Sequence, residues 1–203
     1  MTDATPPDDH AVTRFAIVRH GETDWNVQRR IQGATDIPLN DTGRVQARET
    51  ALLLDDRPWH SIVASPLSRA SETATIIAAT LGLEAPEIVP DLAERSHGVL
   101  EGLDHRGRAA VEAQAASIEG LEPRSVVIER ARRALLELAA AHPGEDVIVV
   151  THGGVIHALM LDLSDWTFPT PDYAIENGSV HEVIARDGAL VLSLPDAATG
   201  TDG

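Results

Sequence analysis

The chain has 203 residues and a formal net charge of −16 at pH 7, with 43% hydrophobic but only 3% aromatic residues. This length suits one domain whose core is built mainly from Ala, Val, Leu and Ile. The negative charge argues against partners such as nucleic acid or an anionic membrane, and no apolar run approaches the roughly 18 residues of a membrane span. The absence of cysteine excludes disulfides and cysteine metal ligands. We expect a soluble, cytoplasmic protein.

Strand-like and helical patterns alternate between two polar ends. We expect disordered tails at 1–13 and 196–203 and a single domain over 14–195. Asn40 opens a cap cluster before one helical pattern, and Gly82 is a typical helix C-cap after another. The elements expected in this half are, in chain order, a strand at 14–18, a helix at 40–56, a strand at 60–65, a helix at 67–82 and a brief strand at 86–90.

The second half begins with a stretch of low hydrophobicity, 101–124, in which we expect a loosely patterned helix near 108–118. Apolar strands that alternate with helices favour an α/β fold with a mainly parallel sheet and helices on both faces. The turn Asp187–Gly188 predicts a terminal hairpin, which would add an antiparallel edge. The remaining expected elements are a helix at 125–142, a strand at 146–151, a helix at 153–163 and the hairpin at 178–194.

Polar side chains follow three of the expected strands. These are Arg19 and His20 after the first, Ser65 after the second, and Thr151 and His152 after the strand at 146–151. Because ligands of open α/β sheets bind beyond the carboxyl ends of the strands, we expect these groups to meet. Glycine follows each histidine, and the second histidine precedes a helix whose first amides favour an anion.

Phosphoryl transfer explains this combination better than metal chemistry. A neutral imidazole can attack phosphorus, guanidinium groups neutralise the phosphoryl oxygens, and a carboxylic acid can protonate the leaving oxygen. Arg69 lies at a helix start, where a cation opposes the helix dipole, and Glu94 follows the third strand. Taken singly, His20 could be a turn or core residue, Arg69 a solvated helix residue, and Glu94 with Arg95 a surface ion pair.

The other motifs carry little chemistry. We expect five histidines to be structural or surface residues because they lack metal-ligand spacing. We expect the "NGS" at 177–179 to form a turn. Neither GxGxxG nor GxxxxGK[ST] occurs in the positions that would cradle a nucleotide phosphate. The five histidines are His97, His105, His142, His157 and His181.

The residues resemble the histidine phosphatase superfamily, in its phosphoglycerate mutase-like branch with an RHG motif. Five blocks in family order carry the resemblance, which covers about residues 14–185: "RHGETDWN" at 19–26, "GATDIPLNDTGRVQA" at 33–47, "SPLSRASETA" at 65–74, "LAERSHGVLEG" at 92–102 and "VVTHGG" at 149–154. The resemblance implies a three-layer α/β/α sandwich without a metal or organic cofactor, and it is compatible with a homodimer.

The resemblance also implies roles for single residues. His20 would be the nucleophile that becomes phosphohistidine, and Glu94 would be the general acid and base. Arg19, Arg69 and His152 would form the phosphate pocket. The family positions that match Asn26, Gln32 and Gly33 imply contacts to the phosphate or the substrate.

The resemblance leaves three functions open: a phosphatase acting on a small phosphomonoester, a cofactor-dependent phosphoglycerate mutase, and a non-catalytic member that binds a phosphorylated ligand or a partner. "ERSHGVLEGL" at 94–103 fits the mutases, but "THGG" replaces their usual Ala-His-Gly-Asn. The short segment after Glu94 favours hydrolysis because it offers fewer cations and easier entry of water. "EPRS" at 122–125 departs from the Gly-Glu-Ser common in phosphatase members. We expect a phosphatase.

Overall fold

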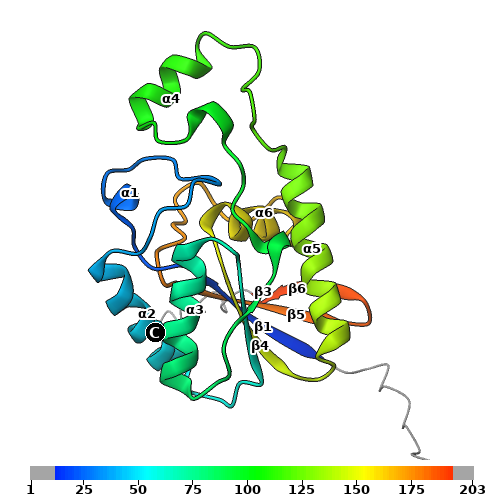
Figure 1. Ribbon diagram of the computed structural model, residues 1–203. Coiled ribbons are helices and arrows are strands. Elements are labelled where there is room, and N and C mark those ends of the chain that lie inside the picture. The colour runs from blue at the N-terminus through cyan, green and yellow to red at the C-terminus, as the bar shows by residue number, and fades with distance from the viewer. Residues whose placement is uncertain (1–11, 194–203) are drawn as a thin grey trace, which may run out of the picture.

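A computed structural model describes residues 12–193 and contains one six-stranded sheet with the strand order β3-β2-β4-β1-β5-β6 (Figure 1). The first four strands in this order run parallel, and β5 and β6 form the antiparallel edge as a hairpin. The strands are β1 (Thr13–Arg19), β2 (Ser61–Ala64), β3 (Glu87–Ile88), β4 (Asp146–Thr151), β5 (Val180–Arg186) and β6 (Ala189–Ser193).

Helices cover both faces of the sheet, as the sequence predicts. On one face, α2 (Asp41–Leu54) and α3 (Ser68–Leu81) pack over Ala16, Val18 and Ile148. On the other, α5 (Arg124–Ala141) and α6 (Gly153–Leu163) pack over Phe15, Ile17 and Val149. Successive strand residues point to opposite faces, so a strand that is apolar throughout serves both cores. The predicted three-layer α/β/α sandwich is confirmed.

Local signals set several element boundaries. The Asn40 side chain accepts a hydrogen bond from Gly43 N at 2.8 Å and thereby caps α2. Gly82 ends α3 in the left-handed conformation with φ 71°. Asp187 and Gly188 have φ 51° and 73°, so two successive positive φ angles connect β5 to β6. These three positions agree with the elements expected from the sequence.

Other boundaries differ from the expectation. β1 begins at Thr13, inside the expected tail, while residues 1–11 and 194–203 lie outside the described part of the chain. The helix expected near 108–118 is α4 (His105–Glu112), because Asp104 caps Gly107 N and fixes an earlier start. Three short helices were not expected: α1 (Asp24–Val27) and the 3₁₀ helices η1 (Pro90–Leu92) and η2 (Gly98–Leu100).

The segment 95–123 contains η2 and α4 and forms the top of the molecule in Figure 1, beyond the carboxyl ends of the parallel strands. The segment 95–123 therefore lies over the sheet edge at which the sequence places the candidate site.

Among residues 12–193, no helix is both long and apolar enough to cross a membrane.

Candidate active site

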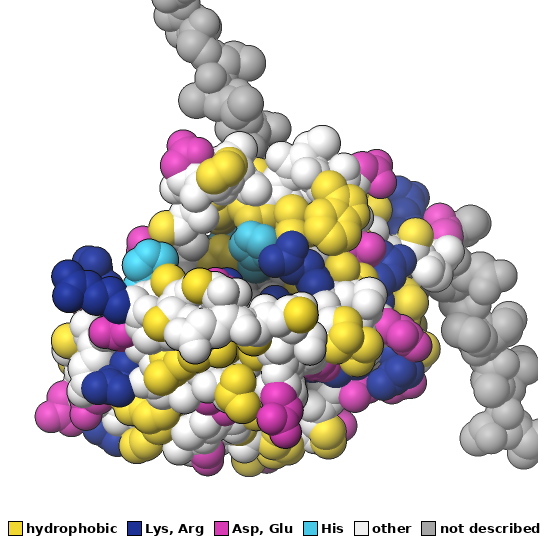
Figure 2. Space-filling model, turned by 90° about the horizontal axis from the view of Figure 1, so that it is seen from above, with side chains coloured by type: hydrophobic (Ala, Val, Ile, Leu, Met, Phe, Trp, Pro, Cys, Tyr) yellow, Lys and Arg dark blue, Asp and Glu magenta, His cyan; other side chains and the backbone are white. Residues whose placement is uncertain are grey.

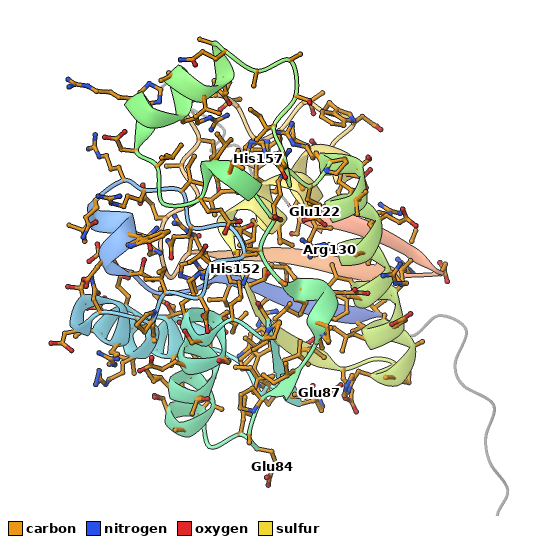
Figure 3. All side chains as sticks on the ribbon, turned by 45° about the horizontal axis from the view of Figure 1, so that its top comes forward. Glu84, Glu87, Glu122, Arg130, His152 and His157 are labelled. Atoms are coloured by element: carbon orange, nitrogen blue, oxygen red, sulfur yellow. The ribbon has the colours of Figure 1, made fainter. Side chains whose placement is uncertain are left out.

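The side chains expected at the strand ends come together at the carboxyl edge of the sheet. His20 follows β1, Ser65 follows β2, and His152 follows β4, and all three are buried. His152 lies at this edge, whereas Glu84 and Glu87 lie at the opposite end of the sheet (Figure 3). Seen from above, this face is hollowed, with histidine and arginine side chains in and around the hollow (Figure 2).

His20 is held in a defined tautomer. Its Nδ1 lies 2.7 Å from the carbonyl oxygen of Gly21, and because a carbonyl only accepts, Nδ1 must carry the proton. Nε2 therefore keeps its lone pair. Burial, followed by the positive charges of Arg69 and Arg19, holds the pKa of His20 well below 6.5. The imidazole is neutral at physiological pH and can act as a nucleophile.

His152 lies beside His20, with the two ring centroids 5.1 Å apart. Its Nε2 is 2.6 Å from the Ser65 hydroxyl, which also accepts a hydrogen bond from Leu67 N at 3.3 Å. Nδ1 of His152 is buried without a hydrogen-bond partner among residues 12–193. Burial, with smaller contributions from His20 and nearby arginines, keeps the pKa of His152 well below 6.5. A neutral ring whose Nε2 accepts from Ser65 has Nδ1–H left to donate to a ligand.

Two arginines complete a cationic pocket. Arg19 donates from one terminal nitrogen to the Ile175 carbonyl at 2.5 Å. Arg69 donates to the carbonyls of Thr35 and Gly33 at 2.9 and 2.8 Å. Neither guanidinium forms an ion pair within the described residues, and Nε of each is buried without a partner there. Burial, the largest effect, lowers the pKa of both. Buried donors without carboxylate partners fit an anion such as a phosphoryl group.

Glu94 lies against the start of α6. Its carboxyl oxygens accept hydrogen bonds from Arg95 N at 2.8 Å and from Gly154 N at 3.2 Å. Burial raises the pKa of Glu94, although these two bonds, Arg69 and Arg19 oppose the rise. A carboxyl group with a raised pKa can donate a proton. One of the first amides of α6, where the sequence predicts an anion, is thus already bound to this carboxyl group.

The three expected substrate-binding positions line the adjoining loop. Asn26 Oδ1 accepts from Thr23 N and Oγ1 at 3.0 Å each, which caps α1. Gln32 Oε1 lies 3.0 Å from the same hydroxyl, whose single proton is shared between these two acceptors. The Gly33 carbonyl holds Arg69, so Gly33 reaches the site through that guanidinium.

Comparison with known proteins assigns the chain to a family. Residues 15–196 match the family described as "Histidine phosphatase superfamily (branch 1)". The chain belongs to the histidine phosphatase superfamily. It is 43% identical over 155 residues to the Bacillus subtilis "Uncharacterized phosphatase PhoE", covering 75% of this chain and 78% of that protein. It is 39% identical over 196 residues to an Arabidopsis thaliana "Metal-independent phosphoserine phosphatase", covering 89% and 80%.

A solved relative supports the same assignment. The structure of Bacillus stearothermophilus YhfR matches with a TM-score of 0.78 and 30% identity, covering 90% of this chain and 96% of that chain. The expected membership and the phosphoglycerate mutase-like fold are therefore confirmed.

Several residues that support the site in this superfamily member were not singled out from the sequence. Asn177, expected only in a turn, donates to the His20 carbonyl at 2.9 Å. Thr73 accepts from Gly21 N at 3.0 Å. Gly21 also packs against the backbone of Gly43, where a Cβ atom would collide. Close packing against the Gly43 backbone therefore requires glycine at position 21.

An ion pair between Arg130 on α5 and Glu122 fixes the segment that carries Glu94. Arg130 donates to Glu122 Oε1 at 2.8 Å and to the carbonyls of Asp91 and Ala93 at 2.6 Å each. Figure 3 shows Arg130 and Glu122 close together beside α5. Because Ala93 precedes Glu94, these bonds connect α5 to the backbone of the candidate acid.

The five histidines that the sequence analysis set aside occupy varied places. His105 begins α4 and is exposed. The His142 ring pairs with Glu145 at 2.8 Å, and the His181 ring contacts the Ser179 hydroxyl at 2.9 Å. His97 and His157 line a cavity beside Gly154. Within residues 12–193, no three His, Cys, Asp or Glu side chains are grouped so as to hold a metal ion.

Proposed function

We propose that this histidine phosphatase superfamily member hydrolyses small phosphomonoesters through a phosphohistidine on His20. The observation that carries the proposal is the set of three buried donors without partners around the neutral His20 ring: Arg19 Nε, Arg69 Nε and His152 Nδ1. They would bind the three non-bridging oxygens of a phosphoryl group. The phosphatases among its relatives support the same reaction class.

The reaction has two steps. In the first, the lone pair of His20 Nε2 attacks phosphorus, the bond from phosphorus to the leaving oxygen breaks, and Glu94 donates its proton to that oxygen. In the second, the Glu94 carboxylate takes a proton from water, whose oxygen attacks phosphorus and breaks the N–P bond. Inorganic phosphate leaves, and His20 and Glu94 regain their starting states.

The supporting residues act on charge and orientation. Ser65 would donate its hydroxyl proton to His152 Nε2 and so keep Nδ1–H directed at the phosphoryl oxygens. Asn26 and Gln32 would contact the bound substrate from the loop next to Thr23. Because Glu94 must be protonated at the start, we assign the protein to the phosphatases that work best at acidic pH.

His20→Ala tests the proposal. The variant should lose turnover of p-nitrophenyl phosphate at mildly acidic pH, and the wild type quenched during turnover should carry an acid-labile phosphoryl group that the variant lacks. Retained turnover in a folded His20→Ala variant would contradict the role of His20. Measuring primer-dependent isomerisation of 3-phosphoglycerate separates this function from that of a mutase.

A further inference from the structure

The loop 33–35 presents carbonyl oxygens to Arg69. The guanidinium donates from its two terminal nitrogens to the carbonyls of Thr35 and Gly33, at 2.9 and 2.8 Å. Its Nε is buried without a hydrogen-bond partner among residues 12–193, and no ion pair joins it to a carboxylate there. The loop therefore offers only partial negative charges to a full positive charge, which is costly to bury in this way.

Glu101 lies on the other side of the same loop. Its two carboxylate oxygens accept hydrogen bonds from Ala34 N at 2.9 Å and from Thr35 N at 3.0 Å. The Thr35 hydroxyl donates to the carboxylate as well. Gly33 packs so closely against Glu101 that a Cβ atom on Gly33 would collide with the carboxyl group. A cation and an anion thus hold the loop from opposite sides.

One peptide unit connects the two charges directly. The peptide between Gly33 and Ala34 is trans, so its C=O and N–H bonds point in opposite directions. The C=O accepts from Arg69, and the N–H donates to Glu101. Each of these hydrogen bonds polarises the peptide in the sense that strengthens the other. Glu101 therefore acts as the counter-charge of Arg69 without occupying the guanidinium.

The ionisation of Glu101 agrees with this arrangement. Burial by itself raises the pKa of Glu101, but the hydrogen bonds that the carboxylate accepts outweigh burial, so the pKa lies below 4.5. Burial lowers the pKa of Arg69, and the negative charge of Glu101 is among those that oppose this fall. His97 N also donates to the carboxylate, at 2.9 Å, so Glu101 joins the segment 95–123 to the loop.

We propose that Glu101 is a positioning residue for phosphate binding, which fixes the loop 33–35 and through it orients Arg69 toward the phosphoryl group. This inference rests on the proposed function. A direct ion pair between the two side chains would compete with the phosphoryl group for the guanidinium. A carboxylate one peptide away stabilises the charge and the orientation of Arg69 while its Nε stays available to the ligand.

The test measures the binding of inorganic phosphate by calorimetry at pH 7 and kcat/KM for p-nitrophenyl phosphate. Glu101→Gln keeps the shape of the side chain but turns one acceptor oxygen into an amide nitrogen, which cannot accept from the loop. It should weaken phosphate binding and lower kcat/KM, each by about tenfold. Thr35→Val removes only the hydroxyl donor to Glu101, so it should weaken phosphate binding by about twofold to threefold.

A double-mutant cycle separates positioning from a general structural effect. In an Arg69→Met background, Glu101→Gln should weaken phosphate binding by less than about twofold, because the guanidinium that Glu101 positions is gone. Glu72→Gln is the matched control. Glu72 lies on α3 together with Arg69 but pairs with Arg44 at 2.7 Å, so its loss should leave phosphate binding unchanged.

Three results would overturn the positioning role of Glu101: unchanged phosphate binding in Glu101→Gln, the same tenfold loss in the Arg69→Met background, or an equal loss in Glu72→Gln. If Glu101→Gln does not fold, Thr35→Val decides by the same comparisons. If wild type binds phosphate but hydrolyses no ester, the proposed function fails and the binding data still decide the role of Glu101. A wild type that binds no phosphate would overturn both proposals.

Discussion

The ion pair between Arg130 and Glu122 should contribute measurably to stability. Its side chains are only 13% and 17% exposed. Arg130→Met removes the bonds to both Glu122 oxygens, at 2.8 and 3.1 Å, and those to the carbonyls of Asp91 and Ala93. Glu122 would then keep its side-chain bond from Ser96 N, at 3.2 Å, and remain a poorly solvated charge.

Breaking a buried pair costs about 3–5 kcal/mol, and the residual exposure of this pair favours the lower end, about 3 kcal/mol. For a domain of this size such a loss lowers Tm by about 6–12 °C. The double variant Arg130→Met with Glu122→Met removes the unpaired charge as well, so it should cost only about 1–2 kcal/mol.

Urea unfolding followed by tryptophan fluorescence measures these free energies. Arg133→Met is the matched control, because Arg133 lies on the same helix and pairs with Asp91 at 2.8 Å but is 50% exposed. It should cost less than about 1 kcal/mol. Glu122→Met alone leaves Arg130 without its carboxylate and should likewise cost about 3 kcal/mol. A double variant that loses about 6 kcal/mol, the sum of the two single losses, would refute the coupling between Arg130 and Glu122.

Two further predictions concern Glu94. The pKa of His20 lies well below 6.5 and that of Glu94 above its usual 4.5, so kcat/KM should rise with pH as His20 loses its proton and fall as Glu94 loses its own. Glu94→Gln should abolish the fall of kcat/KM at higher pH and slow the hydrolysis of alkyl phosphates by about 10²–10⁴. If kcat/KM of the variant still falls at higher pH, another group causes that fall. In Gly154→Ala the added Cβ would collide with Glu94 Oε1 and displace the carboxyl group, so turnover should fall about tenfold or more. The Tm of this variant should not fall, because alanine favours the helix. Unchanged turnover would contradict the close packing of Gly154 against Glu94.

The fold was predictable where local signals agree. The continuously apolar strands, the Asn40 cap and the turn at Asp187–Gly188 each favour one structure without help from distant residues. α1 was missed because the capping box of Thr23 and Asn26 spans only four helical residues. The start of α4 was placed too late because its weak apolar pattern gives less information than the cap at Asp104.

The site was predictable where residues follow parallel strands, because these ends must share an edge. Asn177 precedes β5 instead. Since β5 is antiparallel to β1, its beginning lies at the same edge as the ends of the parallel strands. A residue that precedes the first strand of the predicted hairpin should therefore lie near the site, and this reasoning could have identified Asn177 from the sequence. The bond between Arg130 and Glu122 had no such signal, because it depends on how the segment 95–123 folds back onto α5.

Burial in a cationic pocket shifts the pKa values of His20 and Glu94 in opposite directions, toward the neutral form of each. Desolvation favours the neutral form of every ionisable group, so it lowers the pKa of His20 and raises that of Glu94. The nearby Arg19 and Arg69 lower both pKa values, which helps His20 but opposes the protonation of Glu94. A bound phosphoryl group would neutralise these arginines and relieve that opposition. Substrate binding should therefore raise the pKa of Glu94 further and protonate the acid when the leaving oxygen needs its proton.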